Sequence, residues 1–233
     1  MLGVIINTIT VIIGSCVGLL FKKGISEKVS KSVMLGLGVC TLYIGISGSL
    51  CGENVLILIP SIVLGAITGT VLKIDAHINS LALKVENRFK RGEQDISVSE
   101  GLVTATLLFC VGSMTVTGSI QAGLTGDNTI LITKATLDLI SSMMLASSLG
   151  IGVLLSAVSV FAIQGGLVIL AGLIAPFMST GAINEMTCAG SLLIIMIGTN
   201  MMGITKLKVA DFLPAILYAP IIYNIALFVK NLI

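Results

Sequence analysis

Lys134 and Asp138 are two charged residues that lie well inside a stretch of sequence apolar enough to cross a membrane. One ionisable group in hydrocarbon costs at least about 2.5 to 3.5 kcal/mol, so a chain that keeps two needs a compensating interaction or a use for them. A spacing of four residues puts both on one helix face, where an ammonium and a carboxylate can pair. Lys134 begins near the outer end of its stretch and could instead reach the interface. Asp138 begins one turn deeper, so it must be paired, hydrated in a cavity, or protonated.

The composition assigns the chain to the integral membrane proteins. Of its 233 residues, 55% are hydrophobic and 10% are charged, and the mean hydropathy is +1.11. A soluble domain carries about 25% charged residues. The net charge of +2 does not indicate a nucleic-acid partner. We therefore expect an all-α bundle of transmembrane helices that forms one domain over residues 1–233, with the lipid bilayer as its surroundings and no nucleic-acid partner.

Eight apolar runs are long enough to cross about 30 Å of hydrocarbon, and they leave no room for a soluble domain. The expected spans are residues 3–21, 32–50, 54–73, 101–123, 130–149, 152–175, 186–204 and 210–229. The weakest boundary lies at residues 150–152, which we interpret as a tight glycine turn between the fifth and sixth spans. The segment 74–100 carries apolar residues at helical spacing, and we expect an amphipathic linker on the membrane surface.

The basic residues predict how the chain is oriented. Those that follow the first, third and seventh runs are Lys22, Lys23, Lys28, Lys31, Lys73, Lys84, Arg88, Lys90, Arg91, Lys206 and Lys208. With eight alternating spans, all of these residues lie on one side of the membrane. The positive-inside rule places that side in the cytoplasm. Both termini are then expected outside.

A weak internal repeat relates the two ends of the chain. Residues 55–63 (VLILIPSIV) align with residues 209–217 (VADFLPAIL), and the preceding spans end in the glycine-containing tracts 45–48 and 198–203. Under the predicted orientation, spans one to three and six to eight would form an inverted repeat, as in many secondary transporters. Glycine and proline are common in membrane helices, so a chance alignment is the alternative.

Several other polar residues lie inside the apolar runs. Ser113, Thr117 and Gln121 share one stripe of the fourth span, which predicts a polar seam with the charged pair of the fifth span. The remaining residues of this kind include Asn7, Gln164, Thr199, Asn200 and Asn224. Taken singly, each is better explained as a group that hydrogen-bonds two helices, an interaction worth about 0.6 to 2 kcal/mol.

These motifs together resemble a known family. The matching tracts are residues 109–114 (FCVGSM), 118–123 (GSIQAG), 126–127 (GD), Lys134 with Asp138, 150–153 (GIGV), 164–165 (QG), 198–203 (GTNMMG) and 213–215 (LPA). They are similar to the bacterial membrane family catalogued as domain of unknown function 554, over essentially the whole chain. The resemblance implies a multi-pass protein of the bacterial inner membrane without an assigned substrate.

Two functions are left open by these residues. The first is transport of a small solute or ion, in which Asp138 binds the coupling cation or proton and Lys134 is its counter-ion. The expected substrate contacts are Ser113, Thr117, Gln121, Gln164 and Asn200. The second is a structural or regulatory protein in which the charged pair only locks two helices. Because the chain lacks metalloprotease, serine-hydrolase and nucleotide-binding motifs, we expect no enzymatic activity, metal centre or cofactor, and leave a homo-oligomer open.

Overall fold

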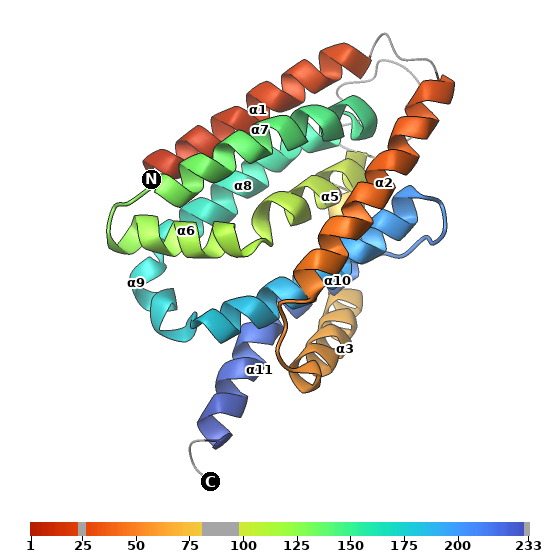
Figure 1. Ribbon diagram of the computed structural model, residues 1–233. Helices are drawn as coiled ribbons and strands as arrows, with labels where there is room; N and C mark the ends of the chain where they lie inside the picture. Colours follow the sequence, from red (N-terminus) through yellow and green to blue (C-terminus); the bar gives the residue numbers. More distant parts are fainter. Residues whose placement is uncertain (23–26, 81–97, 231–233) are drawn as a thin grey trace.

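The chain folds into packed helices whose outer faces are apolar (Figure 1). The computed structural model describes residues 1–22, 27–80 and 98–230. In chain order the elements are α1 (Leu2–Lys22), α2 (Glu27–Ser49), α3 (Val55–Val71), the short helix Ile74–Ser80, α5 (Val98–Cys110), α6 (Ser113–Leu124), α7 (Thr129–Leu149), α8 (Ile151–Ile169), α9 (Ala171–Ile174), the 3-10 turn η1 (Ala175–Phe177), α10 (Thr180–Met201), the 3-10 turn η2 (Val209–Phe212) and α11 (Ala215–Lys230). The described ranges contain no strand.

Six candidate spans in the described part of the chain are long and apolar enough to cross a membrane, and two bent helix pairs bring the number to as many as eight. They coincide with the eight predicted runs, so the prediction of an all-α multi-pass bundle is confirmed. The seventh span begins at Thr180 and not at residue 186, because Ser179 caps α10 by accepting a hydrogen bond of 3.3 Å from the backbone N–H of Ala182.

The fourth predicted span, residues 101–123, is two half-helices. α5 and α6 are bent by 61° at Val111 and Gly112, where Gly112 has extended backbone angles. The hydroxyl of Thr115 donates a hydrogen bond of 2.8 Å to the carbonyl of Phe109. In a continuous helix that carbonyl would accept from residue 113, so Thr115 satisfies a group that the break exposes. The fourth span is therefore interrupted at a glycine, although the sequence did not single out Gly112 as the position of the break.

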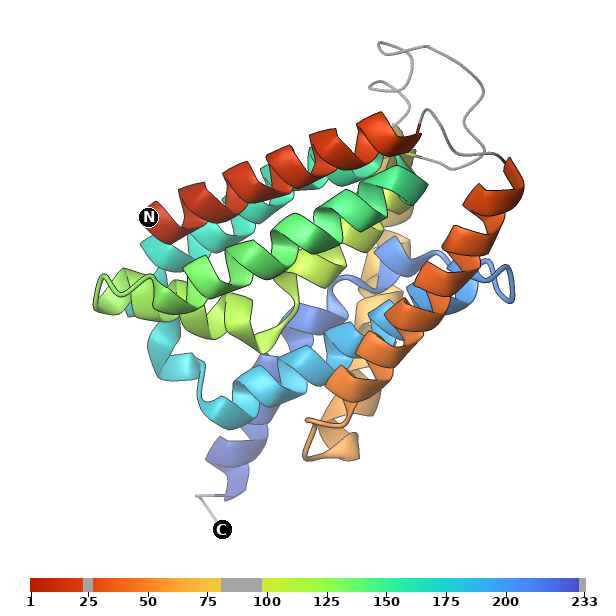
Figure 2. The same cartoon turned by 45° about the horizontal axis from the view of Figure 1, so that its top comes forward.

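Glycines bring α1 and α7 into close contact. Gly14 and Gly18 of α1 lie directly against the backbone carbonyls of Leu139 and Met143 on α7, where a side chain would not fit. α2 and α10 pack in the same manner, with Gly45 against the backbone of α10. Small residues allow such approach in membranes, where no hydrophobic effect drives helices together. Figures 1 and 2 show the two helix pairs on either side of α5.

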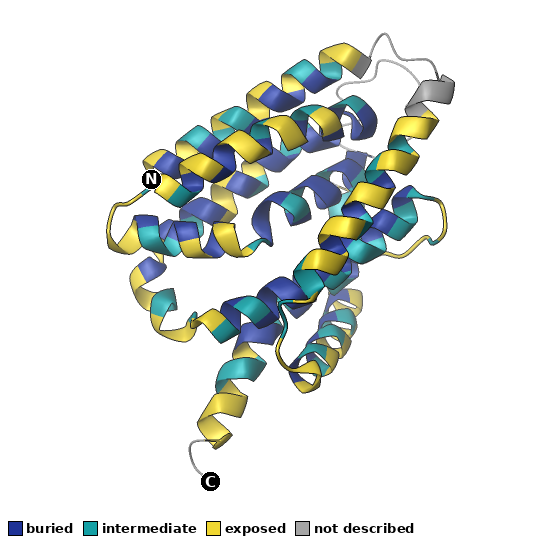
Figure 3. Ribbon diagram, in the orientation of Figure 1, coloured by how far each residue is buried: buried dark blue, intermediate teal, exposed yellow. Residues whose placement is uncertain are grey.

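The interior is formed mainly by α5 and α10, which carry long buried stretches (Figure 3). One apolar cluster joins Leu107 of α5, Leu149 of α7, Val153 of α8 and Leu193 of α10. The outer faces of α1, α2, α3 and α11 expose many large apolar side chains. Such faces are suited to contact with lipid, as expected of a membrane protein.

The turn predicted between the fifth and sixth spans is confirmed. α7 ends at Leu149, Gly150 has a φ of +78°, and α8 begins at Ile151. Glycine adopts this conformation without the clash that a β-carbon would cause. The sharp turn lets α7 and α8 run side by side in opposite directions (Figure 2).

The predicted linker over residues 74–100 lies partly outside the described residues, which omit 81–97. Its beginning forms the helix Ile74–Ser80, bent by 53° from α3. Ile74 and Ile78, the first two residues of the predicted apolar stripe, pack against the main apolar cluster. This part of the segment therefore contacts the protein core and does not lie free on a membrane surface.

The segments aligned as an internal repeat lie against each other. Gly65 of α3 faces Ala215 of α11, and Gly69 faces Asp211 of η2, so the two segments run in opposite directions. α2 and α10, which precede them, are also antiparallel. An inverted repeat would produce contacts of this kind between related helices, and the repeat itself stays a prediction.

Three described segments that carry basic residues lie on one side of the bundle. The end of α1, the beginning of α2 and the loop 202–208 lie on the same side in Figures 1 and 2, opposite the N-terminus and the α6–α7 turn. This side carries Lys22, Lys206 and Lys208, and we call it the basic side. That it faces the cytoplasm stays a prediction.

Candidate functional site

Lys134 and Asp138 form a salt bridge inside the bundle, as their spacing predicted. Lys134 Nζ donates a hydrogen bond to Asp138 Oδ2, and the two residues are only 5% and 6% exposed. Asp138 lies near the middle of the 21-residue α7. The Lys134 side chain points inward to the Asp138 carboxylate and does not extend to the membrane interface.

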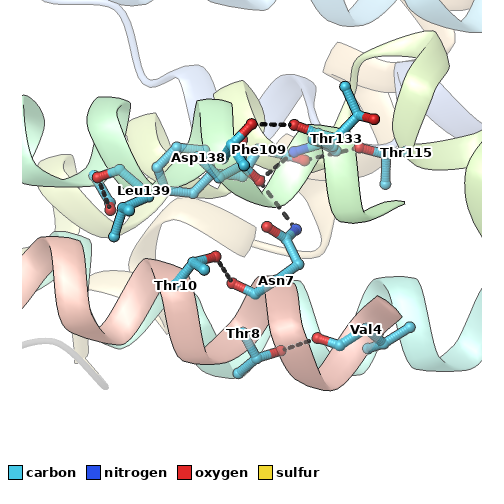
Figure 4. A network of polar contacts seen from close by, with 12 residues as sticks. Val4, Asn7, Thr8, Thr10, Phe109, Thr115, Thr133, Asp138 and Leu139 are labelled. Atoms are coloured by element: carbon cyan, nitrogen blue, oxygen red, sulfur yellow. Dashed lines mark hydrogen bonds and ion pairs between the residues drawn. The ribbon is translucent and has the colours of Figure 1, made fainter. Parts of the chain in front are cut away.

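Asn7 of α1 is a second partner of Asp138 (Figure 4). Its Nδ2 donates a hydrogen bond of 3.0 Å to Asp138 Oδ2, and the residue is fully buried. The glycine contacts bring α1 close enough to α7 for the Asn7 side chain to reach Asp138. The sequence marked Asn7 as a polar residue at depth but did not place it at the site, because nothing in the sequence states that the first and fifth spans pack together.

The break between α5 and α6 lies beside the charged pair. Lys134 Nζ is 5.8 Å from the ring centroid of Phe109, next to the last residue of α5. Cys110, the last residue, lies within electrostatic range of both Lys134 and Asp138. The C-terminal end of a helix carries partial negative charge, and an aromatic face attracts cations. The end of α5 therefore stabilises the Lys134 ammonium.

Four helices carry buried polar side chains at about the depth of the pair. On the side of the N-terminus lies an apolar cluster with one residue each from α1, α6, α7 and α8. Its members are Val4, Ala122, Leu131 and Val168. One turn farther into the bundle, the same four helices carry the buried residues Asn7, Ser119, Lys134 and Gln164. We call these four residues together with Asp138 the polar layer.

Several atoms of the polar layer lack a hydrogen-bond partner among the described residues. Gln164 is fully buried with both amide atoms unpaired, and the same is true of Ser119 Oγ and Asn7 Oδ1. An unsatisfied buried polar group costs about 1 to 3 kcal/mol, so a ligand, ion or water that pairs with these atoms gains that amount. The layer offers oxygen ligands at about the depth of the Asp138 carboxylate, and oxygen ligands suit a hard cation. No three His, Cys, Asp or Glu side chains in the described ranges are grouped to hold a metal ion.

The stripe of Ser113, Thr117 and Gln121 does not face the pair. Ser113 and Thr117 are exposed, and Gln121 Nε2 donates a hydrogen bond of 2.8 Å to Asp127 Oδ2 in the α6–α7 turn. The predicted seam between this stripe and the pair is not formed. Residues two positions away on a helix lie about 200° around its axis, so the inward face of α6 instead carries Ser119.

Asp127 holds the turn that precedes α7. Its Oδ1 accepts hydrogen bonds from the hydroxyl of Thr129 at 2.6 Å and from its backbone N–H at 2.9 Å, while Gln121 donates to Oδ2. These bonds stabilise the charged carboxylate and hold the pKa of Asp127 below its ordinary value. They fix the start of the helix that carries the charged pair.

Asn200 lies in a different place, on the basic side. Its Oδ1 accepts hydrogen bonds from the Thr205 hydroxyl and the Leu207 N–H, and its Nδ2 donates to the Leu207 carbonyl at 2.8 Å. The side chain thereby fixes the loop 202–208, one wall of a cavity of about 430 Å³. Asn200 and the polar layer belong to separate regions of the molecule.

Glu185 is a buried carboxylate that the sequence reasoning missed. It is 1% exposed, and its Oε1 accepts hydrogen bonds of 2.8 Å from the backbone N–H groups of Glu53 and Asn54, at the start of α3. Its Oε2 is buried without a partner in the described part of the chain. The span was expected to begin at residue 186, which left Glu185 outside it. The capping signal of Ser179 was present in the sequence and marks the true start.

Known sequences match almost the whole chain. The pattern of the family described as "Protein of unknown function (DUF554)" matches residues 2–224. "Uncharacterized membrane protein YdfK" of Bacillus subtilis (strain 168) is 34% identical over 226 residues, which cover 95% of each chain. "Uncharacterized protein YqgA" of Escherichia coli (strain K12) is 29% identical over 221 residues, 94% of each chain. No solved structure matches the chain.

Proposed function

The chain belongs to the DUF554 family of membrane proteins, and from its polar layer we propose that it transports a small solute or an ion across the bacterial inner membrane, with both termini outside. The observation that carries the proposal is the position of the buried Lys134–Asp138 pair, which lies beside a break in a membrane-spanning helix. Charged residues at this depth mark ion or substrate paths in membrane proteins. Interrupted helices are typical of transporter sites near the bilayer midplane.

The polar layer supplies a role for each of its side chains. Asp138 binds the coupling cation or proton, and Lys134 occupies the carboxylate when neither is present. A cation that reaches Asp138 competes with Lys134 for Oδ2, the same oxygen that accepts from Asn7. Binding therefore releases the ammonium and changes the contact between α1 and α7, which gives the two ligation states different helix packing.

The unpaired atoms support the same proposal. Gln164, Ser119 and Asn7 keep buried oxygens without a partner among the described residues. Each unpaired oxygen destabilises the empty site, and this penalty is removed when a solute or ion pairs with the oxygen. In the proposed mechanism these three residues contact the transported species, in place of Ser113, Thr117 and Gln121.

A second function is favoured by how closely the pair is enclosed. Both charged residues are almost completely buried, and Asn7 and Phe109 cover them from α1 and α5. Such a pair also suits a structural or regulatory membrane protein in which it only locks three helices together. The two functions differ in whether the identity of each charge at its own position matters.

Flux measurements on reconstituted protein test the proposal. Proteoliposomes with wild-type protein or Asp138→Asn are exposed in turn to gradients of protons, sodium, potassium, amino acids, amines and carboxylates, and the transient current is recorded. We expect a current from the wild type that Asp138→Asn abolishes while the variant stays folded. A current that survives in Asp138→Asn refutes the role of Asp138.

The exchanged variant Lys134→Asp with Asp138→Lys separates the two functions. A locking pair tolerates exchange because both charges remain within reach of each other, whereas a coupling carboxylate is moved by one helical turn and loses Asn7. We expect the exchanged protein to fold without transporting. Absence of any flux from the wild type, together with full stability of the exchanged protein, favours the structural function.

A further inference from the structure

A cavity of about 430 Å³ lies on the basic side, away from the polar layer. Its walls are the helix Ile74–Ser80, the first half of α5, the end of α10, the loop 202–208 and η2. The polar and charged residues used below are Asp75, Asn79, Glu100, Thr104, Asn200 and Lys206. Pockets that hold small organic molecules have volumes of about 300 to 1,000 Å³, so the space suits such a ligand.

Two carboxyl side chains line this cavity. Asp75 and Glu100 are half-buried, whereas Lys206 is exposed. Asp75 Oδ2 accepts a hydrogen bond of 2.9 Å from the neutral side chain of Asn79. Glu100 has no cationic partner among the described residues. Two half-buried carboxyl side chains that line one cavity favour a bound cation.

Thr104 is an independent sign of a ligand. It lines the cavity, it is 1% exposed, and its hydroxyl oxygen has no hydrogen-bond partner in the described ranges. Thr104 lies one turn deeper than Glu100 on the same face of α5, so a molecule held by Glu100 extends toward this hydroxyl. A hydroxyl accepts hydrogen bonds from an ammonium as readily as it donates them.

We propose that this cavity binds small organic amines, with the ammonium group held by Glu100 and Asp75 and a second polar group near Thr104. As a binding site it is independent of transport. As the inner vestibule of a transport path it rests on the proposed function. The ligand class follows from the sign of the buried charge and from the size of the space, since an inorganic cation would leave most of the volume unfilled.

An apolar plug separates the cavity from the polar layer. Val103 and Ile197 line the cavity and belong to the same buried cluster as Phe109 and Cys110, which border the charged pair. Phe109 is five positions after Thr104 on α5, a distance of about 7.5 Å along the helix axis. A bound amine therefore stops at the plug, and passage to Asp138 requires the α5 and α10 contact to open.

Equilibrium binding of radiolabelled 1,4-diaminobutane to the purified full-length protein in detergent tests the site. Succinate and 4-aminobutyrate have similar lengths and different charges, so they serve as competitors. We expect saturable binding of 1,4-diaminobutane, weaker competition by 4-aminobutyrate and no competition by succinate. Glu100→Gln should weaken binding at least about tenfold, because a charge-assisted hydrogen bond is lost. Asp75→Asn should weaken it in the same direction.

Two control variants make the outcome specific. Glu53→Gln removes one carboxylate from the loop that follows α2, outside the cavity. Binding of 1,4-diaminobutane should be unchanged. Asp138→Asn should keep diaminobutane binding even if it loses transport, so failure of the proposed function is distinguished from failure of this site. Unchanged affinity in a folded Glu100→Gln protein, competition by succinate equal to that of the amine, or no saturable binding overturns the proposal.

Discussion

Replacing Lys134 with methionine tests whether the buried pair is one energetic unit. The substitution keeps the volume of the side chain and removes its charge, which leaves the Asp138 carboxylate 6% exposed with the single hydrogen bond from Asn7. Removing one partner of a buried ion pair costs about 3 to 5 kcal/mol. Protonating an aspartate of ordinary pKa 3.9 at pH 7 costs about 4.2 kcal/mol, which sets an upper limit on this penalty. We therefore expect Lys134→Met to lose about 3 to 4 kcal/mol at pH 7.

Removing both charges together tests the same point. The double variant Lys134→Met with Asp138→Leu removes both charges, and its stability should lie within about 1 kcal/mol of the wild type.

Equilibrium unfolding in mixed micelles, followed by far-ultraviolet circular dichroism, measures these differences. Lys230→Met is the matched control, because this lysine is exposed in the last turn of α11 and should change the free energy of unfolding little. The reasoning is refuted if Lys134→Met costs less than about 1 kcal/mol, or if the double variant is as unstable as the single one.

Three further substitutions test the contacts around the site. Gly14→Val should cost about 1 to 3 kcal/mol in unfolding free energy because a side chain there meets the backbone of α7, whereas Gly36→Val, with open space around it, should cost less; equal losses would contradict the packing. Thr129→Val should raise the pKa of Asp127 toward its ordinary value, as measured by carboxyl carbon NMR. The ionised Asp127 stabilises the fold above the pKa that it has in the unfolded chain, and this stabilisation is lost as the pH falls through its pKa in the folded protein. In Thr129→Val the loss should occur at a higher pH. An unchanged pKa of Asp127 would contradict the role of its hydrogen bonds with Thr129. Glu185→Met should cost about 1 to 3 kcal/mol because the backbone N–H groups of Glu53 and Asn54 lose their acceptor, and a neutral result in thermal unfolding would contradict this reasoning.

The two candidate regions lie on opposite sides of one apolar cluster. The polar layer is closed toward the N-terminal side by Val4 and its neighbours, and the amine cavity is closed toward the interior by Val103 and Ile197. If the protein is a transporter as proposed, this structure is an occluded state, because apolar side chains block access to Asp138 from either side of the membrane. The break at Gly112 joins α5, which lines the cavity, to α6, which carries Ser119 of the polar layer.

Sequence patterns identified what depends on neighbouring residues in the chain. Eight apolar runs and few charges determine a multi-pass helical protein, because crossing hydrocarbon requires each backbone to satisfy its own hydrogen bonds within a helix. The pairing of Lys134 with Asp138 follows from the helical repeat alone. The turn at Gly150 was visible as a glycine between two runs.

The contacts between distant segments were decided only by the tertiary structure. Asn7 reaches Asp138 across 131 positions of sequence because glycines let α1 approach α7. The break at Gly112 depends on Thr115 replacing a lost backbone hydrogen bond, and it turns Ser119 inward where the sequence favoured Ser113 and Thr117. Helix periodicity states which residues share a face, but it does not state which neighbour that face meets, since the choice is made by close packing among all the helices at once.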